Sequence, residues 1–170
     1  MHITLMELKK CWNLKMNMRT KLDRCLEIVL VGLIAIILIN VVWQVITRYL
    51  FNTPSSVTEE ISRFGLIWFG FLGAVYANSK GLHLAIDVLI ESTQNKTKIF
   101  FSILINLLIF IFSFGVLIVG GLNLIIINYQ LGQLTAGLGI HMGHIYLVIP
   151  ISGLIICFHC FENLIALKIN

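Results

Sequence analysis

The chain of 170 residues is poor in charge: Asp, Glu, Lys and Arg make up 12% of it, whereas hydrophobic residues make up 58%. An ordinary soluble domain has about 25% charged residues, so the composition excludes that class of protein. Charge is absent from several runs of about 20 residues, the length that crosses a bilayer as a helix. The sequence therefore predicts an all-α, multi-pass integral membrane protein.

Acidic residues are absent from the apolar runs themselves. Neither Asp nor Glu occurs in residues 28–47, 64–79, 99–130 or 145–161. A small exchanger of protons or cationic drugs needs an acid inside a span. The chain is therefore not expected to carry an ion or proton alone, and the pattern favours a partner subunit that is not an enzyme.

Cysteine is also scarce where redox chemistry would need it. The four cysteines are Cys11, Cys25, Cys157 and Cys160, and the loops predicted to face outward have none, which argues against a thiol oxidase. Cys157 and Cys160 have C-x-x-C spacing, but a zinc site needs four ligands and only His159 lies nearby. We interpret them as small apolar helix residues, and predict no metal and no cofactor.

The apolar runs predict four transmembrane helices at about residues 25–47, 60–79, 99–128 and 145–167. The third run stays uncharged to Gln130, which is longer than a bilayer needs. Tilt, a bend at Gly120-Gly121 or an extension beyond the membrane would accommodate it.

Basic residues set the orientation. Ten Lys and Arg residues lie in the N-terminal tail, between spans two and three, and at the C-terminus, against only Arg48 and Arg63 on the opposite side. The positive-inside rule then places both termini in the cytoplasm, with the spans among membrane lipids. The same rule explains the net charge of +4 without nucleic-acid binding.

Two segments outside the spans remain. The tail, residues 1–24, is either an interfacial helix or a product of a translation start upstream of Met18. After the second span, Lys80, His83, Asp87 and Glu91 fall on one helical face among apolar residues. That pattern predicts a short amphipathic helix in the headgroup layer.

The second span carries a stripe of small residues with charges at its first turns. Ser56 and Glu59 have the spacing of a capping box. At 100° per residue one stripe contains Glu59, Arg63, Gly70, Gly73, Ala74 and Ala77, while Trp68 lies opposite. Small residues let membrane helices approach closely, so the stripe is predicted to face a protein partner. The alternative is an ordinary span with charged ends.

Polar residues also share a face of the first span: Asn40, Trp43, Gln44 and Thr47. Arg48 follows at the end of this span. Such side chains usually bond to neighbouring helices, although they could line a solute path. Glu59 and Arg63 are spaced for a helical ion pair. Glu60 lies about 100° further round the helix, and Arg48 is its expected partner.

Two other functions compete at this point. A haem-carrying membrane anchor of an oxidoreductase would need two axial histidines from different spans. His141 and His144 are predicted on the outer side, so only His83 and His159, on the inner side, could share a haem. A structural membrane anchor of an oxidoreductase would need none. A homo-oligomeric small transporter is the other alternative.

The run from Trp43 to Leu89 resembles the small membrane subunit of the tripartite ATP-independent periplasmic (TRAP) transporters. The resemblance covers roughly residues 20–165 and rests on a combination of features: Gln44, Arg48-Tyr49, Thr58-Glu59-Glu60, Trp68, Gly73-Ala74, Gly81-x-His83, Asp87 and Pro150. The long tail before Met18 departs from the family pattern. So does Gly139-Ile140-His141, where a proline is expected.

The resemblance implies sodium-driven uptake of an organic acid, of the sialic acid or C4-dicarboxylate type, delivered by a periplasmic substrate-binding protein. It also implies that transport and the sodium sites belong to a separate, large multi-span permease subunit. The small subunit would be a scaffold for that subunit in the inner membrane of a bacterium.

Overall fold

The computed structural model describes residues 2–50, 56–80 and 95–169, with side chains for 19–50, 56–80 and 101–163. Within these residues the fold is a bundle of helices with one isolated β-bridge. The elements are α1 (His2–Leu50), α2 (Ser56–Ser79), α4 (Asn95–Phe112), the π-helical η1 (Ser113–Gly120), α5 (Gly121–Gln130), α6 (Met142–Tyr146) and α7 (Val148–Ile169).

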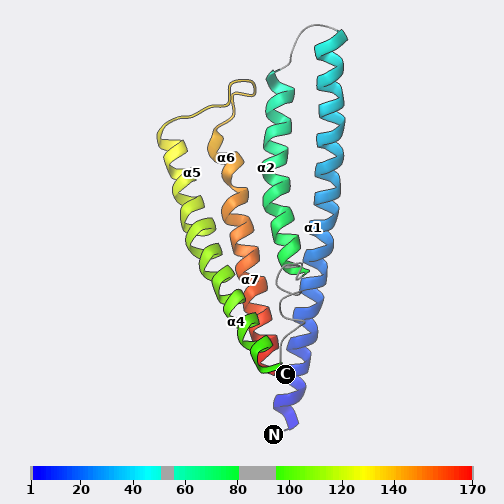
Figure 1. The fold of residues 1–170 in the computed structure, drawn as a ribbon, viewed down its shortest axis with the longest axis vertical. Coiled ribbons are helices and arrows are strands. Elements are labelled where there is room, and N and C mark those ends of the chain that lie inside the picture. Colours follow the sequence, from blue (N-terminus) through cyan, green and yellow to red (C-terminus); the bar gives the residue numbers. More distant parts are fainter. Residues whose placement is uncertain (1, 51–55, 81–94, 170) are drawn as a thin grey trace.

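Helix α1 runs without a break from His2 to Leu50, so the N-terminal tail and the first predicted span form one helix. Figure 1 shows α2 beside its second half. The more buried α1 side chains recur every three or four residues, as one face of a helix requires: Asp23, Leu26, Leu30, Leu33, Ile37 and Asn40.

Three helices are long and apolar enough to cross a membrane: Arg19–Leu50, Phe101–Gln130 and Met142–Asn163. Three of the four predicted spans thus have a counterpart. Helix α2 has 24 residues but is less apolar, because Glu59, Glu60 and Arg63 occupy its first turns and Asn78 its last.

Helix α7 lies between α2 and the α4–η1–α5 rod (Figure 1). The buried apolar cluster comes from three helices: Leu26 of α1, Leu72 and Val75 of α2, and Val148, Ile156 and Cys160 of α7. The faces of α1 and of the rod that point away from this core expose many large apolar side chains. A bilayer is the solvent such faces require.

The apolar run 99–130 forms one continuous helical rod whose π-helical segment ends at Gly120. This segment packs closely on α7. Ser113 Oγ donates to the carbonyl oxygen of Gly153 at 2.9 Å. A Cβ added at Gly153 would lie 2.8 Å from the Leu117 Cβ, so glycine is needed for this approach.

Candidate partner-binding surface and its supporting contacts

Helices α1 and α2 are joined by Asn40, a residue of the predicted polar face. Its Nδ2 donates to the carbonyl oxygen of Thr58 at 2.6 Å and to Ser62 Oγ at 2.7 Å. Ser62 is buried in this contact. Asn40 therefore holds α1 and α2 together through two hydrogen bonds.

The rest of the polar face of α1 is more open. Gln44, Val45, Arg48, Tyr49 and Glu59 line an open groove of about 450 Å³ between the end of α1 and the start of α2. Thr47 Oγ1 donates to the Gln44 carbonyl at 3.0 Å, within α1. Trp43 is 54% exposed. Among the described residues, the groove and the Trp43 ring are open to another molecule.

Glu60 has a different partner from the one expected. Its two carboxylate oxygens accept the backbone N–H groups of Gly137 at 2.9 Å and Leu138 at 3.0 Å, in the loop between α5 and α6. The prediction that Arg48 pairs with Glu60 is therefore wrong. The actual partner could not be read from helical spacing, because it lies 77 residues further along the chain.

Glu60 is 9% exposed, and each of its carboxylate oxygens accepts a hydrogen bond from a loop amide. Its role is therefore structural, at the end of the bundle where α2 begins.

Glu59 and Arg63 form the predicted ion pair, with Arg63 Nη2 2.7 Å from Glu59 Oε1. Both side chains are about 60% exposed in the chain alone. An exposed pair of this kind stabilises a helix by only about 0.3–0.5 kcal/mol. The pair therefore leaves both charges accessible to a neighbouring molecule.

The small-residue stripe of α2 points away from the rest of the chain. Gly70 and Ala74 are exposed, and Gly73 and Ala77 are half-buried. A Cβ added at Gly70 or Gly73 would meet no atom within 4 Å. Trp68 faces the other way, and its Nε1 donates to the Ile145 carbonyl of α6 at 3.1 Å. Among the described residues, therefore, no helix packs closely against Gly70 or Gly73.

His83 and Asp87, with the predicted amphipathic helix, lie outside the described residues. His159 is fully buried beside the Phe158 ring, and neither of its ring nitrogens has a hydrogen-bond partner among the described residues. Such a ring is enclosed by this chain and is not displayed at its surface.

One polar cluster was missed by the reasoning from sequence. At the end of the bundle nearer the N-terminus, Arg19 donates to Asn163 Oδ1 at 3.0 Å and to the Ser79 carbonyl at 2.7 Å. Asp23 accepts the Ser79 hydroxyl and lies 3.8 Å from Lys80 Nζ. The spacing of Arg19 and Asp23 on one face of α1 was the available signal. The cluster ties α1, α2 and α7 together at this end.

Comparisons with known proteins agree with this membrane architecture. The sequence model of the family described as "Tripartite ATP-independent periplasmic transporters, DctQ component" matches residues 24–168. A TRAP transporter small permease protein of Haemophilus influenzae is 41% identical over 70 residues, which are 41% of this chain and 44% of that protein.

Two further relatives carry substrate names. The sialic acid TRAP transporter small permease protein SiaQ of Vibrio cholerae is 27% identical over 143 residues, 81% of this chain and 78% of SiaQ. The C4-dicarboxylate TRAP transporter small permease protein DctQ of Rhodobacter capsulatus is 29% identical over 100 residues, which are 59% of this chain and 44% of that protein. The matched part is less than half of the Haemophilus and Rhodobacter proteins.

The family model covers most of the length of this chain. The chain therefore belongs to the DctQ component family of the TRAP transporters, and it is a multi-pass inner-membrane transporter component and not an enzyme.

Proposed function

We propose that this chain is the small permease subunit that holds a large, separate permease subunit in the bilayer. The complex takes up an organic acid, coupled to sodium and delivered by a periplasmic substrate-binding protein. The observation that carries the proposal is the outward stripe of α2, with Gly70 and Gly73 open and Glu59 and Arg63 exposed beside them. A helix of the large subunit fits such a stripe, since small residues allow close packing in lipid.

A scaffold role agrees with the polar chemistry of the chain. The apolar runs contain no acid that could bind sodium or a proton. Asn40, Glu60 and Trp68 bind other parts of the same chain. Transport and its ion sites therefore belong to the large subunit in this proposal.

The orientation is part of the proposal. Helix α2 has 24 residues and is about 36 Å long at 1.5 Å per residue, enough to cross a bilayer as the fourth span. Its charged first turns then reach the outer interface. The distribution of Lys and Arg favours cytoplasmic termini.

The substrate class rests on relatives alone. One relative is named for sialic acid and another for C4-dicarboxylates. Both are organic acids, and uptake by the reconstituted complex with each binding protein would distinguish them.

The stripe is tested by adding bulk to it. We expect Gly70→Leu to reduce co-purification of the large subunit in mild detergent, because the new side chain would hold the partner helix away. Gly115→Leu is the matched control, since Gly115 is also exposed and open but lies on η1. Equal co-purification of both variants and wild type would show that lipid, and not the large subunit, covers the stripe.

A further inference from the structure

The loop between α5 and α6, residues 131–141, has an unusual surface for a segment between membrane helices. It belongs to a stretch without Lys, Arg, Asp or Glu that extends from residue 99 to residue 161. It exposes three large aliphatic side chains, with exposed fractions of 64% for Leu131, 55% for Leu134 and 46% for Ile140. This apolar surface continues the exposed face of α5 that carries Ile126 and Ile127, which belongs to an apolar span.

Much of the backbone of this loop is hydrogen-bonded within the loop and to the end of α5. The N–H groups of Leu131, Gly132 and Gln133 donate to the last turn of α5. Further donors and acceptors pair across the loop: Thr135 N–H to Ile140 O at 2.9 Å, Gly139 N–H to Thr135 O at 3.0 Å, Ile140 N–H to Thr135 Oγ1 at 3.0 Å and Met142 N–H to Gln133 O at 3.0 Å. Gly132 and Gly139 supply the positive φ angles that its turns need.

Glu60 pairs two further amides of the loop. The amides of Gly137 and Leu138, at the tip of the loop, have no partner in the loop itself and bind the Glu60 carboxylate. Gly137 lies so close to α2 that an added Cβ would be 3.1 Å from Glu60 Oε2. A loop in water does not need such a partner, since water would bind its amides. Close to the acyl chains such a partner matters more, because water becomes scarce toward the hydrocarbon core.

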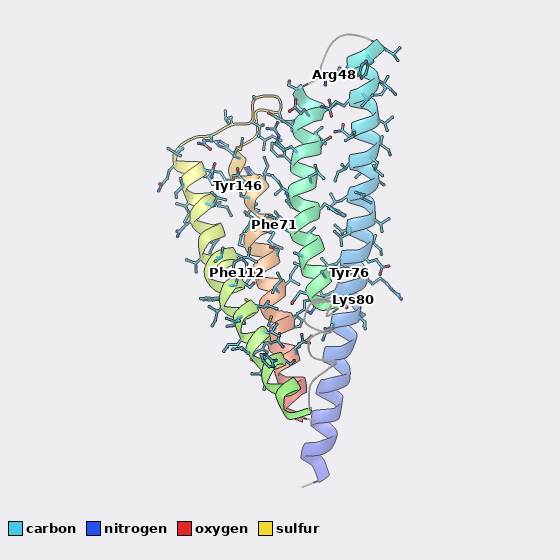
Figure 2. All side chains as sticks on the ribbon, viewed as in Figure 1. Arg48, Phe71, Tyr76, Lys80, Phe112 and Tyr146 are labelled. Atoms are coloured by element: carbon cyan, nitrogen blue, oxygen red, sulfur yellow. The ribbon has the colours of Figure 1, made fainter. Side chains whose placement is uncertain are left out.

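The position of the loop along the long axis of the bundle agrees with a place at the edge of the bilayer. Figure 1 shows it folded over the ends of α5 and α6 and beside the start of α2, while α1 extends further along the long axis. The last turn of α1 carries Arg48, labelled at that end in Figure 2, and Tyr49, which is 76% exposed. Arg and Tyr are typical residues of the membrane interface. The loop therefore lies on the membrane side of that turn.

We propose that the α5–α6 loop is a lipid-contacting surface that lies in the headgroup layer of the bilayer, and that Glu60 holds it there by binding its tip amides. Leu131, Leu134 and Ile140 then face the acyl-chain boundary. This contact is a property of the chain itself and does not depend on the large subunit proposed above.

The test places an environment-sensitive fluorophore on single cysteines, Leu134→Cys and Ile140→Cys. Cys11, Cys25 and Cys157 are first replaced by serine, and the fully buried Cys160 is kept. The full chain is studied in phosphatidylethanolamine–phosphatidylglycerol nanodiscs, alone and with the large subunit. The quenchers are a lipid with a nitroxide near its headgroup and aqueous iodide, and Asn52→Cys of the α1–α2 connection is the reference.

We expect the nitroxide lipid to quench both loop probes, and iodide to quench them less than the reference, in the chain alone as well as in the complex. Quenching by iodide equal to the reference, without nitroxide quenching, would place the loop in water and overturn the proposal. Shielding from both quenchers that appears only with the large subunit would assign the surface to a protein partner, and would also overturn it.

A second comparison tests the role of Glu60. Glutamine has one acceptor oxygen and an NH₂ group that would oppose the loop amides. We expect Glu60→Gln to raise iodide quenching at the Leu134 probe, while Glu59→Gln, which changes an exposed neighbour, leaves it unchanged. Equal quenching in the two variants would show that the hydrogen bonds from the loop amides to Glu60 do not hold the loop in place. That part of the proposal would then be wrong.

Discussion

Two adjacent glutamates of α2 have opposite environments. Glu59 is about 60% exposed and pairs with Arg63 on its own helix, whereas Glu60 is 9% exposed and binds two backbone amides of a distant loop. We therefore expect Glu60→Gln to lower the Tm of the chain in detergent clearly more than Glu59→Gln. Equal Tm values for the two variants would contradict the buried role of Glu60.

At the scale of elements, the contact of η1 with α7 depends on a missing side chain. Gly153→Ala would place a Cβ 2.8 Å from the Leu117 Cβ and beside the hydrogen bond from Ser113. Overpacking of this kind costs about 1–3 kcal/mol, so we expect a lower Tm. Gly115→Ala, in open space on the same segment, is the control. A Gly153→Ala variant as stable as the control would mean that the two helices separate without cost.

At the scale of the whole molecule, the proposed orientation predicts which side of the membrane each position faces. We expect an impermeant thiol reagent added outside spheroplasts to label Asn52→Cys, and to leave Cys11 and Lys96→Cys unlabelled until the membrane is opened. Labelling of the latter two in intact spheroplasts would reverse the orientation, and with it the proposed assignment of the two ends of the bundle.

The sequence by itself determined what depends on local spacing and composition. Uncharged runs predicted the three apolar membrane helices, since transfer into lipid depends on the residues of each run. The Glu59–Arg63 pair followed from a separation of four residues on one helix. The family resemblance rested on motifs within one stretch of the chain, and the match to residues 24–168 confirms it.

Only the tertiary structure decided the contacts between distant segments. The partner of Glu60 is a loop 77 residues away, and Arg19 binds Asn163 across 144 residues. Helical periodicity gives the direction in which a side chain leaves its own helix, but not which helix lies there. The pairing of helices depends on how their faces pack together, and that packing placed Glu60 beneath the loop and left the stripe of α2 open.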